Sequence, residues 1–232
     1  MNESNGNTPP STDPTPAIYL DFDGVINAFP DGKVLRRGGI GHTGWLKDDD
    51  PRKILYSEER AFRLDGNKQA RTNRGRYRIH YSTEITDGLR SLAEAGRVEL
   101  HWLTTWQDYC ESTLNPLLGW DGRYITTEHW YDPETGEHRK TGKRKTVYDA
   151  IRRQDKPIIW IDDEECHDAR LIEIEALQRK WPVLMIRPDE RIGISRRQWA
   201  LIQRFASTME TFPPVALDEE DTVHEHDKHI GF

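Results

Sequence analysis

The chain has 232 residues, of which 35% are hydrophobic and 31% are charged, and its formal net charge is −7. This length suits one domain with added segments, and no apolar run is long enough to span a bilayer. Two cysteines without a CxxC spacing argue against a disulfide framework or a zinc site, and they make a reducing compartment, the cytoplasm, the expected location.

The two ends of the chain differ from its centre. Residues 1–16 are rich in Asn, Ser, Thr and Pro and have no apolar period, so we expect a disordered N-terminal tail. Residues 213–232 are acidic, and we expect a second disordered tail there. Most of the net negative charge lies in these ends, and the nearly neutral residues 17–212 are expected to form the folded domain.

The first predicted strand ends in two carboxylates. Ala17–Leu20 is apolar without alternation, which is typical of a buried strand. Asp21 and Asp23 follow it and point the same way at its carboxyl end, since side chains of an extended chain repeat every two residues. Gly24 then permits a sharp turn. Two carboxylates this close repel unless a cation or a shared proton relieves them, so the pattern indicates a divalent cation, usually Mg²⁺ beside phosphate. A solvated surface turn is the alternative.

Residues 28–80 form an insert before the next predicted strand. The insert is too short and too poor in apolar residues for a large helical domain, so we expect a small flap of loops and hairpins. Its second half, residues 60–78, is strongly basic. Arg71, Arg74 and Arg76 are therefore candidate contacts to a polyanionic substrate. A solvated, mobile insert is the alternative.

A helix and a second strand follow this insert. Residues 83–95 have the apolar spacing of a helix. Residues 98–103 are rich in β-forming residues, and hydroxyl groups follow at Thr104 and Thr105. Thr104, the first hydroxyl after the apolar run, is the candidate hydrogen-bond donor at the end of this strand, with Thr105 as the second choice. A simple helix cap is the alternative role for this threonine.

Aromatic and basic residues precede the last acidic motif. The aromatic side chains of residues 120–138 predict the core of a hairpin insert, or a surface that stacks on bases. The basic residues 139–145 lead into a helix with one apolar face. Lys145 at the predicted helix start is the first choice for a functional cation at the start of this helix. Lys143 is the second choice and a candidate substrate contact.

Residues 157–161 form a short apolar run that ends in the adjacent acids Asp162 and Asp163. Buried acids are costly unless they are paired or bind a metal, so both are candidate metal ligands. Adjacent residues of an extended chain face opposite ways, so both need not bind the ion directly.

The remaining elements complete an α/β pattern. A helix is predicted after the acidic pair, a strand at Val183–Ile186, and a further helix that begins with a capping box of Ser195 and Gln198. Alternating strands and helices predict a mostly parallel, Rossmann-like sheet with helices on both faces. Ligands bind at the carboxyl ends of the strands in such sheets, where the acidic pairs and Thr104 fall.

The segment Asp-Phe-Asp-Gly-Val-Ile-Asn, followed in order by a threonine, a lysine and an acidic pair, resembles the motifs of the haloacid-dehalogenase-like (HAD) hydrolases. The resemblance covers roughly residues 17–188 and implies a HAD-like fold with small cap inserts. It implies that Asp21 is a nucleophile that takes up a phosphoryl group and that Asp23 is the general acid and base. Thr104 and Lys145 would stabilise the charge on the transferred oxygens.

The same resemblance implies a Mg²⁺ site. The ion would be held by Asp21, by the backbone carbonyl of Asp23 and by Asp163. Asp162 would then orient the lysine or a metal-bound water. The opposite assignment of Asp162 and Asp163 stays open.

The Trp-Leu-Thr-Thr-Trp and Trp-Ile-Asp-Asp-Glu segments resemble, more narrowly, the compact HAD domains associated with RNA repair proteins and polynucleotide phosphatases. We therefore expect a Mg²⁺-dependent phosphomonoester hydrolase that acts through an aspartyl-phosphate on an RNA or DNA end, or on a nucleotide. The alternatives are an open-cleft protein phosphatase of HAD type and a non-catalytic metal-binding interaction module. No membrane partner is expected.

Overall fold

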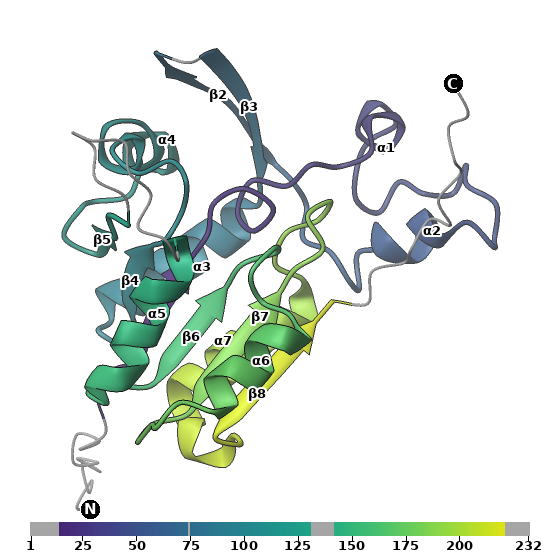
Figure 1. The fold of residues 1–232 in the computed structure, drawn as a ribbon. Coiled ribbons are helices and arrows are strands. Elements are labelled where there is room, and N and C mark those ends of the chain that lie inside the picture. The colour runs from purple at the N-terminus through teal and green to yellow at the C-terminus, as the bar shows by residue number, and fades with distance from the viewer. Residues whose placement is uncertain (1–13, 74, 131–141, 221–232) are drawn as a thin grey trace, which may run out of the picture.

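The computed structural model describes residues 14–73, 75–130 and 142–220, which fold around a six-stranded sheet (Figure 1). The strands lie in the order β5-β4-β1-β6-β7-β8, and each neighbouring pair is parallel. Their bounds are β1 Ala17–Leu20, β4 Glu99–Trp102, β5 Ile125–Thr127, β6 Ile158–Ile161, β7 Val183–Arg187 and β8 Val215–Glu219. The predicted Rossmann-like α/β fold is confirmed.

Helices cover both faces of the sheet. Alternate residues of each strand point to opposite faces, so each face contributes side chains to a core of its own. Ile18 and Leu20 of β1 share one core with α3 and α7, whereas Ala17 and Tyr19 share a second core with α5 and α6. Within the described residues, no helix has the length and apolar character needed to cross a bilayer. The helices that follow the insert are α3 Thr83–Glu94, α4 Asn115–Leu118, α5 Gly142–Arg153, α6 Asp168–Glu175 and α7 Arg196–Thr208, with a π-helical turn at Cys110–Leu114 and a 3-10 turn at Met209–Thr211.

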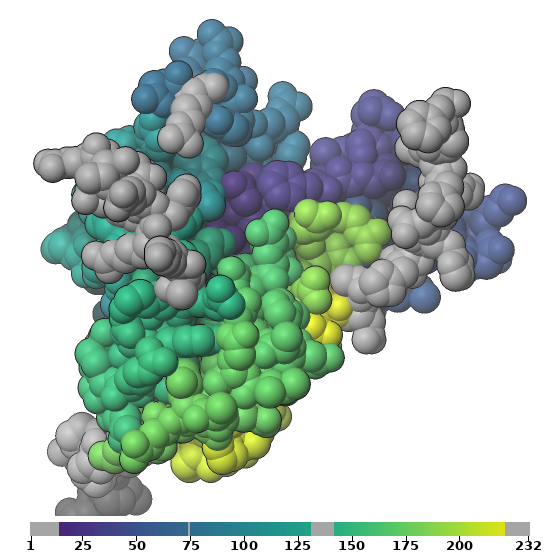
Figure 2. Space-filling model, viewed as in Figure 1, coloured from purple at the N-terminus to yellow at the C-terminus, as the bar shows by residue number. Residues whose placement is uncertain are grey.

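The insert between β1 and α3 consists of two short helices and a hairpin. The helices are α1 Gly32–Arg36 and α2 Pro51–Leu55, which pack around a small core of their own. The hairpin of β2 Gly66–Thr72 and β3 Gly75–Tyr81 projects from the body of the domain (Figures 1 and 2). The insert is therefore small, and its role as a flap stays a prediction.

The disordered tail predicted for residues 213–232 is wrong for its first part. Val215–Glu219 form β8, which extends the sheet beside β7. The acidic residues that suggested a solvated tail are ion-paired in the fold: Asp218 pairs with Arg197, and Glu220 pairs with Arg60 at 2.6 Å. Residues 1–13 and 221–232, which hold most of the two predicted tails, lie outside the described residues.

The hairpin predicted over residues 120–138 is also corrected. Ile125–Thr127 form β5, an edge strand of the main sheet that pairs in parallel with β4. Trp120 stacks on Trp102 with ring centroids 5.1 Å apart, and Trp130 is buried. These tryptophans therefore belong to the cores of the domain and are not free to stack on bases. Residues 131–138 lie outside the described residues.

Candidate functional site

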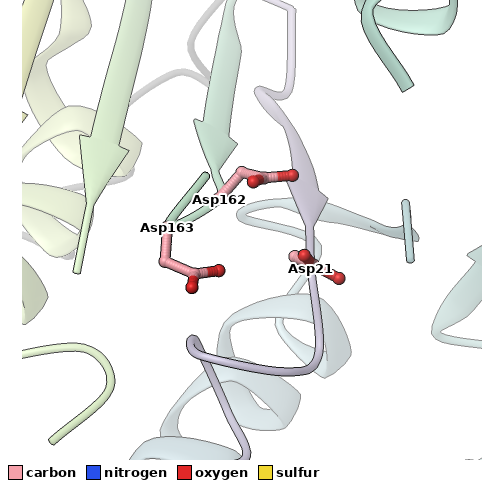
Figure 3. Close-up of side chains that lie close together, drawn as sticks. All are labelled: Asp21, Asp162 and Asp163. Carbon is pink, nitrogen blue, oxygen red and sulfur yellow. The ribbon is translucent and has the colours of Figure 1, made fainter. Parts of the chain in front are cut away.

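Three carboxylates meet at the carboxyl edge of the sheet. β1 and β6 are neighbours with Leu20 opposite Ile161, so Asp21 and Asp162 begin adjacent loops. Figure 3 shows Asp21, Asp162 and Asp163 gathered at the ends of these strands. One carboxylate oxygen from each of the three residues lies within 4.8 Å of the others. The topology of a parallel sheet therefore brings both predicted acidic motifs into one group.

A buried lysine from α5 neutralises part of this charge. Lys143 Nζ donates to Asp162 Oδ2 at 2.9 Å and also to Asp21 Oδ2. The three residues are 8%, 0% and 6% exposed, respectively. Burial lowers the pKa of Lys143. The negative charges of Asp21 and Asp162 together raise this pKa by more than burial lowers it. The net pKa is therefore above its usual value, and the ammonium group stays charged.

The first choice of Lys145 as the cation is corrected by this geometry. The side chain of Lys145 is 49% exposed and pairs with Asp149 one helical turn away. The helix α5 begins at Gly142, before the predicted start, so Lys143 already lies in its first turn. Side chains two positions apart in a helix point in directions that differ by about 200°. Lys145 therefore points away from the site when Lys143 faces it.

The two acids after β6 have different surroundings. Asp162 Oδ2 accepts from Lys143, and Asp162 Oδ1 accepts from the backbone N–H groups of Glu164 and Glu165 at 3.0 and 2.8 Å. Asp162 thus orients a lysine, as expected, although that lysine is Lys143. No side chain among the described residues donates to the carboxylate of Asp163, so this carboxylate is the one open to a cation.

Gly24 makes room for Asp163. Its φ is +71°, and a Cβ atom at this position would lie 2.2 Å from Asp163 Oδ2. Any larger residue in the turn after β1 would therefore displace this carboxylate. The glycine allows the loops after β1 and β6 to close on each other.

The three carboxylates of Asp21, Asp162 and Asp163 together carry more negative charge than the one ammonium group of Lys143 neutralises. Burial first, and then the neighbouring Asp162, raises the pKa of Asp163 to about 7. The same two causes raise the pKa of Asp21, against the opposing effect of Lys143. A cation that binds between these carboxylates would favour their charged forms.

Asp23 lies beside this group and is held by two neutral donors. Asp23 Oδ1 accepts from Asn27 Nδ2 at 2.7 Å, and Asp23 Oδ2 accepts from Trp106 Nε1 at 2.9 Å. Asn27 belongs to the same short loop as Asp23. Trp106 comes from the loop after β4 and is a site residue that the sequence did not single out. The predicted metal contact of the Asp23 carbonyl stays a prediction.

Thr104 lies at the same edge of the sheet. Leu103 N donates to Leu20 O at 2.8 Å, so Thr104 follows β4 next to the loop that carries Asp21. Thr104 is 1% exposed, and its carbonyl accepts from Gln107 Nε2 at 2.7 Å. Its hydroxyl proton has no acceptor among the described residues, so Thr104 keeps a free donor. The second choice, Thr105, is exposed.

The candidate substrate-binding arginines lie apart from the carboxylates. Arg71 and Arg76 are cross-strand partners on the exposed hairpin of β2 and β3. Arg74 lies outside the described residues. The structure therefore separates a charged arm from a buried acidic centre.

No protein-family model, curated protein or solved structure matches this chain. Membership of the HAD family, inferred from the motifs, therefore stays a prediction. The fold and the site define a Rossmann-like α/β domain with a buried carboxylate–lysine centre at the carboxyl edge of its sheet.

We expect the metal-free protein to lose stability relative to its Asp163→Asn variant as the pH rises from about 5 to about 7. The pKa of Asp163 is raised from 3.8 to about 7 on folding, so in this range the folded chain binds more protons than the unfolded chain. The free energy of unfolding then falls with increasing pH. Urea unfolding in EDTA at several pH values measures the effect.

The comparison with the variant removes the contributions of other groups, such as His80, whose pKa burial lowers. If the wild type instead became more stable relative to the variant as the pH rises over this range, the result would contradict the described surroundings of Asp163.

Proposed function

We propose that this protein is a Mg²⁺-dependent phosphomonoester hydrolase that carries the phosphoryl group on Asp21. The observation that supports this proposal best is the group of Asp21, Asp162 and Asp163, in which Lys143 forms ion pairs with Asp21 and Asp162 and leaves Asp163 without a side-chain donor among the described residues. The excess of carboxylate oxygens suits a hard divalent cation. Beside them, Asp23 provides a fourth carboxyl group and Thr104 provides a free hydroxyl donor.

Asp21 and Asp163 are the proposed side-chain ligands of the ion, together with the backbone carbonyl of Asp23. Asp162 is less suited, because it already accepts three hydrogen bonds, one from Lys143 and two from backbone N–H groups, whereas Asp21 accepts two, from Lys143 and from the backbone N–H of Phe22. A bound Mg²⁺ supplies positive charge that offsets the repulsion between the Asp21 carboxylate and a substrate phosphate.

In the first proposed step, a carboxylate oxygen of Asp21 attacks phosphorus. The new oxygen–phosphorus bond forms as the bond from phosphorus to the leaving oxygen breaks. Asp23, protonated at the start, donates its proton to that leaving oxygen. Lys143 and Thr104 donate hydrogen bonds to the transferred oxygens and stabilise their charge.

In the second step, water attacks the phosphorus of the aspartyl-phosphate. Asp23, now a carboxylate, takes the proton of this water, and the bond between phosphorus and Asp21 breaks. Inorganic phosphate leaves, and both carboxyl groups return to their starting states. Asn27 and Trp106 hold the Asp23 side chain in one orientation for both proton transfers.

The proposed substrate is a phosphorylated nucleic-acid end or a nucleotide. The test is phosphate release from a 3′-phosphorylated oligonucleotide, a 5′-phosphorylated one and a panel of mononucleotides. We expect release from at least one of them in Mg²⁺ and none in EDTA. Wild-type protein that releases phosphate from none of these substrates would contradict the proposal.

We also expect Mg²⁺ to raise the midpoint of thermal unfolding of the wild type and to leave that of Asp163→Asn nearly unchanged. Binding to the folded state alone stabilises it by about 2.7 kcal/mol when the ion is at a hundredfold excess over its Kd. Differential scanning fluorimetry with and without Mg²⁺ measures the shift.

Glu164→Gln is the matched control, because it removes one charge at the next, exposed residue. Equal shifts in both variants would place the ion elsewhere.

A further inference from the structure

We propose that the hairpin of β2 and β3 is a docking arm for single-stranded nucleic acid and guides the terminal nucleotide toward Asp23. The proposal deepens the proposed function, because it names the substrate class of the same site. Binding of the strand to the arm, however, does not require catalysis and can be tested without it.

The hairpin has two different faces. Residues directly opposite each other in an antiparallel pair share a face. One face includes Ala70, Ile79 and Tyr81, which are buried in the core that also contains α3. On the other face Arg71 lies opposite Arg76, and Gln69 lies opposite Arg78; these four residues are exposed. Packing of the first face therefore presents the second face to solvent.

The exposed face is positive, and no carboxylate of the described residues compensates its charge. Residues 66–81 contain no Asp or Glu. No carboxylate among the described residues forms an ion pair with Arg71, Arg76 or Arg78, whereas exposed arginines elsewhere, such as Arg123, do form one. Like charges directly opposite each other destabilise a β-pair. An anion that bridges Arg71 and Arg76 would remove this repulsion, and guanidinium groups bind phosphate oxygens in a fork geometry.

The hairpin is attached to Asp23 by two routes. His80 N donates to Asn27 Oδ1 at 3.0 Å, and Asn27 Nδ2 in turn donates to Asp23. The ring of Tyr77 packs edge-on against Trp106 with centroids 5.3 Å apart, and Trp106 Nε1 donates to Asp23 at 2.9 Å. The arm therefore begins beside the proposed general acid and cannot move freely relative to it.

Tyr77 is 41% exposed in spite of its contact with Trp106. Tyr77 lies opposite Ala70, so its ring belongs to the hairpin face that lies opposite the basic face. Arg76, Tyr77 and Arg78 follow one another along β3, whose outer edge has no neighbouring strand among the described residues. A nucleic-acid strand that runs along this edge can place its phosphates against the arginines and stack a base on the ring, as single-strand binding sites do. An acidic protein would match the charge of the arm but would make no comparable use of the ring. The arm therefore favours a nucleic-acid strand.

The test is fluorescence anisotropy in EDTA with a labelled single-stranded oligonucleotide that has no terminal phosphate. We expect Arg71→Ala/Arg76→Ala to weaken binding about tenfold or more and to reduce the slope of log K against log salt by about 1.4, or about 0.7 for each lost phosphate contact. Tyr77→Ala should weaken binding at least about fivefold, and Tyr77→Phe should bind like wild type.

The matched control is Arg123→Ala/Arg152→Ala. This variant removes the same number of positive charges from exposed sites. Both sites lie near the amino ends of β5 and β6, whereas the carboxylates lie at the carboxyl ends of the strands. Equal losses in the two double variants, or no oligonucleotide binding by wild type at low salt, would overturn the proposal. Poly-glutamate that binds as tightly as the oligonucleotide would replace it with an acidic protein partner.

Failure of the proposed function would be seen separately. A chain that binds the oligonucleotide through the arm but hydrolyses no phosphomonoester has a nucleic-acid arm without the proposed chemistry. A chain that hydrolyses small phosphomonoesters but binds no oligonucleotide has the chemistry without the arm.

Discussion

Asp21→Asn is expected to reduce turnover of a phosphomonoester by more than about 10⁴-fold, the range seen when an enzyme loses its nucleophile. The amide has nearly the shape of the carboxylate but is a poor nucleophile for phosphorus. Single-turnover phosphate release in Mg²⁺ measures the effect.

This variant should remain folded. Lys143 keeps its ion pair with Asp162, and the repulsion between Asp21 and Asp162 is removed. We therefore expect an unchanged or higher unfolding temperature in EDTA. Turnover comparable to wild type would refute Asp21 as the nucleophile. Lost turnover together with a much lower unfolding temperature would instead indicate a structural role.

Lys143→Met is expected to destabilise the metal-free protein by about 3–5 kcal/mol, because it leaves two buried carboxylates without their cation. In Mg²⁺ the loss of stability should be smaller. The same variant should lower turnover by about 10²–10³-fold, as expected when a donor to the transferred oxygens is removed. Urea unfolding in EDTA and in Mg²⁺, with steady-state kinetics, measures the three effects.

Lys145→Met is the matched control for this experiment. Its ion pair with Asp149 is exposed, and such a pair contributes at most about 0.5 kcal/mol. The two lysines lie two residues apart on the same helix, so the comparison isolates the direction in which each one points. A larger loss of stability or turnover in Lys145→Met would contradict the placement of Lys143 in the buried centre.

The elements that the sequence predicts correctly are those with local signals. β1 spans Ala17–Leu20 as its unbroken apolar run predicts, and α7 begins with the capping box of Ser195 and Gln198. The neighbouring positions of Asp21 and Asp162 follow from two parallel strands that end at one edge of a sheet.

The errors arise where a signal depends on contacts far along the chain. Lys143 and Lys145 belong to one basic run, and only the observed start of α5 decides which one faces Asp21. Trp106 is 83 residues from Asp23, so no local spacing predicts their hydrogen bond. The acidic composition of the segment around β8 suggested a solvated tail. The arginines that pair with Asp218 and Glu220 come from other segments, so local sequence does not reveal that these charges are neutralised.

The basic insert is an intermediate case. Its composition predicts affinity for a polyanion. Composition does not predict that Arg71 and Arg76 share one exposed face, or that Tyr77 and His80 connect the hairpin to the loop of Asp23. The pairing register of β2 and β3 decides these points.

The most direct test of the proposed chemistry is mass spectrometry of the protein after rapid acid quench during turnover. We predict the added mass of one phosphoryl group on the peptide that contains Asp21, and its absence from Asp21→Asn. A phosphoryl group found on another residue, or turnover by wild type with no such adduct at any quench time, would contradict the account.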